Sequence, residues 1–332
     1  MGVSVAFVLA QLIGWPLAHV APALAGLLLA DPTPPSLAGA RSILGAAFMA
    51  MLANFLISIF LLPYLPVMIL VIALVLYRFY IFIQLSGAPT LAVIGALIGS
   101  IVIPVLVHQQ PEVAVIAGFG LLIDFAVAIL VSWIGFALIP TPDSSPEAEH
   151  ALPSLEEATS TAATLALVVT PFFAAFLIFG WTKILVLGYA AYFATAMSTT
   201  GGLEQGWGKV AANLVFAGGG MLFVYEAFVM VPSIPFMIAS VFGACLFYGL
   251  RIFGGGPSAQ SWSSGFLGFL ILLGGALLSG DVVTPAKLID RVIQIGLATA
   301  YVALAFGVVD VVRSAAARLR AGPPLRGATA AD

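Results

Sequence analysis

Apolar stretches of about twenty residues follow one another along most of this chain, separated by short polar or Pro/Gly breaks. A helix needs about 20 apolar residues to cross the roughly 30 Å hydrocarbon core of a bilayer, whereas the strands of an outer-membrane barrel alternate in polarity. Only 8% of the residues are charged and 62% are hydrophobic, against about 25% charged residues in soluble domains. The sequence therefore predicts an all-α polytopic membrane protein.

The breaks predict about twelve transmembrane helices. These spans lie near residues 2–14, 16–30, 41–62, 64–85, 90–107, 113–139, 163–179, 182–198, 208–230, 233–250, 262–279 and 288–312. Residues 2–30 are also short enough to form one tilted helix of about 43 Å at 1.5 Å per residue. The corresponding stretch 163–198 is too long for that, at about 54 Å, so two helices are expected in both places.

Similar motifs recur in the two halves of the chain in the same order. The pairs are Gly14-Trp15 with Gly180-Trp181, Arg41 with Lys209, Pro63 and Pro66 with Pro232 and Pro235, and Tyr77-Arg78 with Tyr248 and Arg251. An even number of spans per copy makes the copies parallel, with a pseudo-twofold axis along the membrane normal. We expect six-helix repeats at 1–140 and 162–313, a linker at 141–161 and a tail at 314–332.

The stretch from Pro140 to Thr161 is the one clearly polar segment, with five carboxylates, four prolines and no Lys or Arg. Such a composition does not cross a membrane. Lys and Arg near span ends accumulate on the cytoplasmic side, and with the N-terminus inside eight of the 11 basic residues fall there. The expected location is the bacterial inner membrane, with both termini and the acidic linker cytoplasmic.

Two of the carboxylates inside expected spans, Asp124 and Glu226, are candidates for proton coupling. Asp124 lies about 18 Å from the periplasmic end of its helix, near the midplane. A carboxylate at that depth is costly unless it faces a cavity or a partner. Glu226 is the second candidate, although it lies nearer a helix end, where a carboxylate can also simply reach the interface.

The Gly-Trp turns are candidates for substrate binding. The helices at 2–14 and 16–30 are only about 20 Å and 22 Å long, so the turn between them, with Trp15 and with His19 in the first turn of the next helix, can lie below the surface. Broken helices aim positive N-termini into a cavity and suit a carboxylate substrate. Trp181 and Lys183 occupy the second turn. The alternative is that both tryptophans are interface-belt residues.

Two basic residues open the third span of each copy. Arg41 and Lys209 stand where they can gather anions into a pore, but snorkelling and topology-setting explain them as well. The patterns Gly95–Gly99, Gly218–Gly220 and Gly274-Gly275 are expected to mark close helix contacts, and Asn54 to hydrogen-bond between helices.

Sequence motifs for an enzyme are missing. The chain contains no GxxxxGK[ST] and no HExxH motif. Its single cysteine, Cys245, excludes an internal disulfide and a CxxC site. We therefore expect no enzyme activity, no cofactor and no metal site.

The two halves resemble the membrane part of the fusaric acid resistance and aromatic acid exporter family. The likeness rests on a short helix, a Gly-Trp turn, a second short helix, and a loop with a basic residue opening the next helix, PPSLAGARSILGA in one copy and GGLEQGWGKVAANLVFAG in the other. It is greatest for the short, membrane-only branch of uncharacterised function. The six-helix unit is shared with aluminium-activated malate transporters. Larger exporters carry soluble cytoplasmic domains that are missing here.

The resemblance implies proton-driven export of aromatic carboxylic acids through the inner membrane, with a periplasmic membrane-fusion adaptor as partner and Arg41 and Lys209 lining the pore. We expect a small organic anion as substrate. A passive anion channel is the first alternative, because the same basic residues suffice for it. A membrane scaffold for an envelope complex, without transport, is the second.

Overall fold

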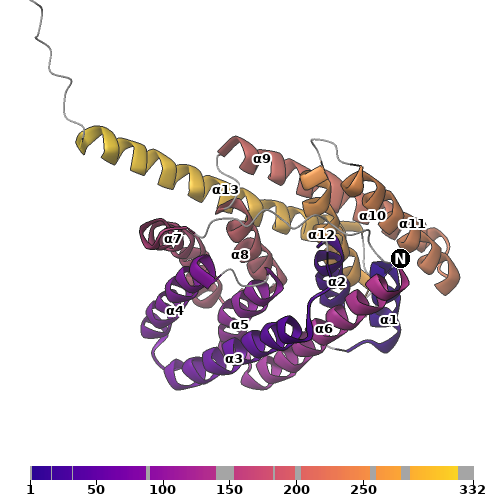
Figure 1. The fold of residues 1–332 in the computed structure, drawn as a ribbon, viewed down its shortest axis with the longest axis horizontal. Helices are drawn as coiled ribbons and strands as arrows, with labels where there is room; N and C mark the ends of the chain where they lie inside the picture. Colours follow the sequence, from indigo (N-terminus) through magenta and orange to yellow (C-terminus); the bar gives the residue numbers. More distant parts are fainter. Residues whose placement is uncertain are drawn as a thin grey trace, which may run out of the picture.

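The computed structural model describes residues 2–15, 17–31, 33–86, 90–139, 153–181, 184–198, 203–254, 259–277 and 285–320. This described part is helical, without strands, and forms twelve continuous helical segments (Figure 1). In chain order they are α1 (Gly2–Ile13), α2 (Val20–Ala30), α3 (Leu37–Leu61), α4 (Leu65–Ser86), α5 (Thr90–Gln109), α6 (Pro111–Leu138), α7 (Leu155–Phe179), α8 (Ile184–Ser198), α9 (Leu203–Ala212) with the π-helical η1 (Asn213–Gly219) and α10 (Gly220–Met230), α11 (Ile234–Phe253), α12 (Ala259–Leu277) and α13 (Pro285–Arg320).

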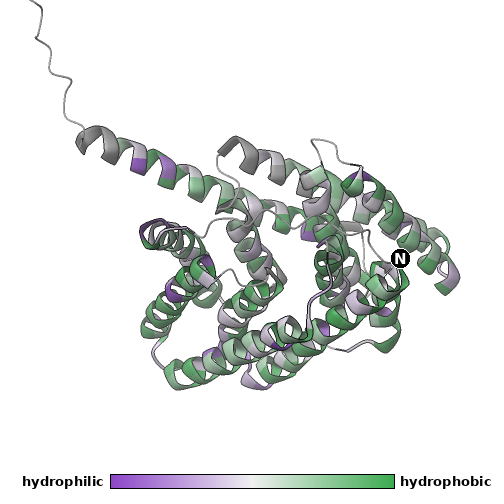
Figure 2. Cartoon of the chain, in the orientation of Figure 1, coloured by the Kyte–Doolittle hydropathy of each residue, from purple (hydrophilic) through white to green (hydrophobic). Residues whose placement is uncertain are grey.

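Each expected span coincides with one of these segments. Eight are long and apolar enough to cross a membrane, whereas α1, α2, α8 and α12 are shorter apolar helices. Apolar residues run along nearly the whole length of the helices, and the few hydrophilic residues lie mostly near helix ends (Figure 2). The prediction of an all-α polytopic membrane protein is confirmed.

The first thirty residues form two helices and not one. The turn between α1 and α2 contains two left-handed residues, Gly14 with φ 67° and Leu17 with φ 64°. This conformation is uncommon for a residue with a side chain. The second helix begins later than expected, at Val20, so His19 is its N-cap residue and not part of its first turn.

The seventh helix begins at Leu155, within the segment expected to be linker. Ser154 and Glu157 form a capping box. The Ser154 hydroxyl accepts the backbone N–H of Glu157 at 3.3 Å, and the Glu157 carboxylate accepts the backbone N–H of Ser154 at 3.0 Å. Such reciprocal bonds satisfy two N–H groups that a helix end otherwise leaves free. The helix therefore starts directly after its N-cap residue Ser154, although the sequence there is polar. Residues 140–152 lie outside the described part.

Four helices, α2, α5, α8 and α12, lie inside the bundle and the others surround them (Figure 1). Among them, α5 packs on α8 and α2 packs on α12. Around them, α3 packs on α5, and η1 packs on α12. At the periphery, α4 packs against α7, and α11 packs against α1.

Glycines allow the backbones of α3 and α5 to approach closely. A Cβ atom added at Gly99 would lie 2.9 Å from the backbone nitrogen of Met51, and one at Gly95 would lie as close to Ala47. Beside this contact, the Asn54 side-chain amide donates to the Ser100 hydroxyl at 3.2 Å. The expectation that the small-residue pattern and Asn54 hold helices together is confirmed at this interface.

Candidate functional site

Trp15 and Asp124 come together at the centre of α6. The Trp15 indole Nε1–H donates to Asp124 Oδ1 at 2.8 Å. Asp124 is fully buried and lies halfway along α6, about 20 Å from either end at the helical rise. The turn that carries Trp15 therefore lies level with the middle of α6, although Ile13 and Gly14 next to it are exposed. This depth favours a broken-helix position for Trp15 over a place in the interface belt.

The same carboxyl group faces the start of α2. The backbone of Ala21, in the first turn of α2, lies beside it, and helix N-termini attract negative charge. The expected attraction of this N-terminus for a carboxylate is thus satisfied in part by a carboxyl group of the chain itself. Within the described residues, the second oxygen, Oδ2, is buried and has no hydrogen-bond partner.

His19 lies in the same turn but contacts a different part of the bundle. Its side chain is only 6% exposed, and neither ring nitrogen has a hydrogen-bond partner among the described residues. It packs on two glycines of α12, because a Cβ added at Gly274 would lie 2.5 Å from the His19 Cβ. A Cβ added at Gly275 would lie 3.5 Å from a guanidinium nitrogen of Arg291 on α13.

Arg291 was not a candidate in the sequence, because a basic residue in the second turn of a span is typical of a span end. The structure places it half-buried near His19. Arg291 also lies within electrostatic range of Tyr225 of α10, the residue before Glu226. This second candidate carboxylate, Glu226, is half-buried and near the end of its helix, as expected.

Trp181 differs from Trp15 although both follow a left-handed glycine, Gly14 in one copy and Gly180 with φ 62° in the other. Trp181 is 45% exposed and its ring lies against Phe176 and Phe179, with centroids 5.2 and 5.6 Å away. Its carbonyl accepts a 2.8 Å hydrogen bond from Gln109, the last residue of α5. This position at a helix end fits the interface-belt interpretation.

The basic candidates are not seen at the Trp15 site. Arg41 is exposed near the start of α3. Lys183 and the side chain of Lys209 lie outside the described residues. Within the described part, no three His, Cys, Asp or Glu residues are grouped so that they can hold a metal ion.

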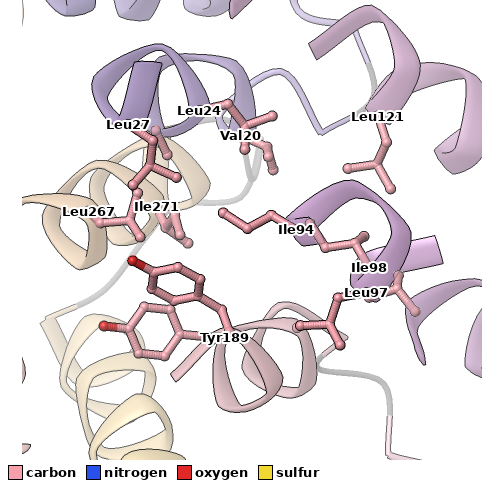
Figure 3. A pocket seen from close by; sticks show the side chains of 14 residues that line it. Val20, Leu24, Leu27, Ile94, Leu97, Ile98, Leu121, Tyr189, Leu267 and Ile271 are labelled. Atoms are coloured by element: carbon pink, nitrogen blue, oxygen red, sulfur yellow. The ribbon is translucent and has the colours of Figure 1, made fainter. Parts of the chain in front are cut away.

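A pocket lies between the four inner helices, and we call it the central pocket (Figure 3). Apolar side chains of α2, α5 and α12 face Tyr189 and Tyr192 of α8 across it. The volume of the pocket is about 80 Å³. This is enough for several water molecules, each of which needs roughly 10–15 Å³ of such space. Two of the lining residues lie close in the chain to residues at the Asp124 carboxyl group. Val20 is the neighbour of Ala21, and Leu121 lies one helical turn before Asp124 on α6.

Nothing in the residue pattern pointed to the central pocket. Tyr189 and Tyr192 read as ordinary residues of an apolar helix, and the pocket exists only because four helices distant in the chain meet. By contrast, the unusual depth of Asp124 in an apolar span was sufficient to single it out.

Residues 1–134 match a family described as "Protein of unknown function (DUF2955)". The matched part covers α1 to α5 and most of α6, and so includes Trp15, His19 and Asp124. No curated protein and no solved structure matches the chain. The chain is thus similar over residues 1–134 of its 332 to a family whose description gives no activity.

Proposed function

We propose that this chain is a proton-driven transporter that exports small organic acids, of the aromatic carboxylic class, from the cytoplasm. The observation that carries the proposal is the position of Asp124. It is a fully buried carboxyl group, one helical turn from a pocket at the centre of the bundle. Intramembrane carboxyl groups in such places are typical of proton relays.

Two equivalent halves support a transporter architecture. We propose that α1–α6 and α7–α13 are parallel repeats related by a pseudo-twofold axis. The two Gly-Trp turns share the left-handed glycine. The central pocket lies between two pairs of corresponding helices, α2 with α8 and α5 with α12. The peripheral contacts fit the same correspondence, because the fourth helix of each proposed repeat packs on the first helix of the other. These contacts are α4 on α7 and α11 on α1.

The two oxygens of Asp124 have different surroundings, which suits proton coupling. Oδ1 accepts the indole N–H of Trp15, which fixes the orientation of the carboxyl group. Oδ2 is the oxygen left to carry the proton. Protonation removes the charge that faces the start of α2, and so weakens the attraction between α6 and that helix N-terminus. The α1–α2 hairpin is then the element whose position responds to the proton.

The sidedness of transport follows from the charge distribution. The basic residues near span ends favour a cytoplasmic N-terminus, so α1 and α2 form a hairpin that enters from the cytoplasmic side. We propose the bacterial inner membrane as location and a periplasmic membrane-fusion adaptor as partner on the far side.

Flux in proteoliposomes tests the proposal. The purified full chain is reconstituted, and uptake of radiolabelled benzoate is measured under a pH gradient with the membrane potential clamped, and under a potential without a pH gradient. Un-ionised benzoic acid also diffuses into protein-free liposomes, so their uptake is subtracted. A proton-coupled transporter accumulates benzoate beyond this reference only when the pH gradient is present. Protein-dependent benzoate flux that follows voltage alone indicates a channel. Absence of protein-dependent flux for any tested acid contradicts transport.

A further inference from the structure

A second cavity adjoins the central pocket, and we call it the side cavity. It lies between α1, α2, α6, α11 and α12 and is about four times as large by the same measure, about 320 Å³. Ala23, Leu27 and Leu267 line both spaces. The side cavity lies toward the end of the bundle where α1 begins and where α2, α6 and α11 end, because Gly2, Ala30, Ile139 and Phe253 line it.

The corresponding region of the other half is filled. Buried residues of α4 and α11 correspond at a constant spacing of 169 positions: Met68 with Met237, Ile72 with Val241 and Leu76 with Cys245. The next buried residues are Tyr80 and Tyr248, 168 positions apart, and Gly249 stands at the spacing of 169 from Tyr80. Tyr80 is 1% exposed in a core shared with α7 and α8, whereas Gly249 lines the side cavity.

The core that holds Tyr80 also contains Ala162 and Leu165 of α7. In the other half, Gly2 and Val3 of α1 and Cys245 and Gly249 of α11 line the side cavity.

The lining of the side cavity is apolar. Among the described residues that line it, Ser263 and Cys245 carry the polar side chains, and none has a charged one. The central pocket has tyrosines and likewise no charged lining residue in the described part. An ionised carboxylate would lose its hydration in both spaces without a cation to replace it, at a cost of several kcal/mol or more.

We propose that the side cavity is the access and binding site for an uncharged apolar organic molecule. This inference rests on the proposed transport function, under which the molecule is the un-ionised form of an aromatic acid. It passes from the side cavity into the central pocket between Ala23, Leu27 and Leu267. It then reaches the end of the pocket near Val20 and Leu121, where Asp124 lies one turn away.

Cys245 provides a direct reporter, because it lines the side cavity and is the only cysteine of the chain. The full-length protein is treated with an uncharged thiol reagent, methyl methanethiosulfonate, and with its charged sulfonatoethyl analogue. Labelling is followed by intact mass. We expect the uncharged reagent to react at least about tenfold faster, relative to the rates of the two reagents with a free thiol in water. Methyl benzoate should slow labelling more than the same concentration of benzoate at pH 7.

The Gly249→Tyr variant tests whether the binding site is the side cavity. It places a tyrosine at position 249, like the Tyr80 side chain in the filled core. A Cβ at Gly249 meets no atom within 4 Å, and the same holds for Gly243 on an exposed part of α11. We expect Gly249→Tyr to slow labelling of Cys245 at least about tenfold by filling the cavity. The matched control Gly243→Tyr should label like the unsubstituted protein.

Equal relative rates for the charged and uncharged reagents, or equal protection by ester and acid, would overturn the proposal. Unchanged labelling of Cys245 in a folded Gly249→Tyr protein would also overturn it. If that variant fails to fold, the proposal is decided by labelling of the Gly249→Leu variant and by protection of Cys245 by methyl benzoate in the unsubstituted chain. Failure of the transport function has a different signature. The labelling pattern then persists while proteoliposomes show no benzoate flux above that of protein-free liposomes.

Discussion

Trp15 and Asp124, 109 positions apart in the chain, share a 2.8 Å hydrogen bond from the indole Nε1 to the carboxyl Oδ1. This bond fastens the turn between two short helices to the middle of a long one. A buried carboxyl group thereby has one oxygen held in place and the other without a partner within the described part of the chain. Both the stability of the hairpin and the proposed proton transfer depend on this pair.

Trp15→Phe should lower stability through Asp124. The substitution leaves Oδ1 unpaired in a buried site, and we expect a loss of about 1–3 kcal/mol, measured by unfolding in detergent. In an Asp124→Leu background the same substitution should cost much less, because the carboxyl group is no longer present. Equal losses in both backgrounds would show that the hydrogen bond does not contribute.

Gly274→Ala should displace the hairpin from α12. The added Cβ would lie 2.5 Å from the Cβ of His19, and overpacking of this kind costs about 1–3 kcal/mol. Gly243→Ala, at an open position of α11, is the matched control and should be neutral or slightly stabilising. Thermal unfolding of the two variants side by side distinguishes them. A Gly274→Ala protein as stable as the control would mean that His19 and α12 are not packed as described.

Tyr80→Ala should destabilise the core between α4, α7 and α8. Tyr80 is 1% exposed in the core, and truncation of a buried aromatic ring costs about 3–5 kcal/mol. Tyr64, at the start of the same helix, is 63% exposed, so Tyr64→Ala should cost little. Chemical unfolding of both variants measures the difference, and similar losses would argue against a filled core around Tyr80.

Ser154→Ala should loosen the first turn of α7. Loss of an N-cap side chain costs about 0.5–2 kcal/mol, and amide hydrogen exchange near Glu157 should become faster. Thr159→Ala, which removes only a local bond to the carbonyl of Glu156, should leave exchange there unchanged. Slow exchange in the Ser154→Ala protein would show that the capping box does not set the start of the helix.

Hydropathy together with the polar and Pro/Gly breaks predicted every helical segment of the described part, because an apolar run of about 20 residues has few ways to satisfy its backbone in a membrane. The start of α7 was missed although Ser154 and Glu157 carry a recognisable capping signal, since the polar composition of residues 140–161 outweighed it. Helix boundaries thus depended on local hydrogen bonds and not on hydropathy.

The candidate site was predictable only in part. Asp124 stands out in any apolar span, but its partner does not, because contacts between residues so far apart depend on how the helices pack. The same applies to Arg291 beside His19. The side cavity was not predicted either, because it lies where residues of α1, α2, α6, α11 and α12 meet and no single stretch of the sequence contains it.

Proton movement coupled to substrate flux tests the central claim most directly. Proteoliposomes containing a trapped pH-sensitive dye are given benzoate, and the rate of pH change is compared for the unsubstituted protein, Asp124→Asn and Glu112→Gln. Glu112 is an exposed carboxylate in the first turn of the same helix. We predict that Asp124→Asn, which keeps an acceptor for Trp15, abolishes the protein-dependent pH change while Glu112→Gln retains it. A full pH change in the Asp124→Asn protein would contradict the account.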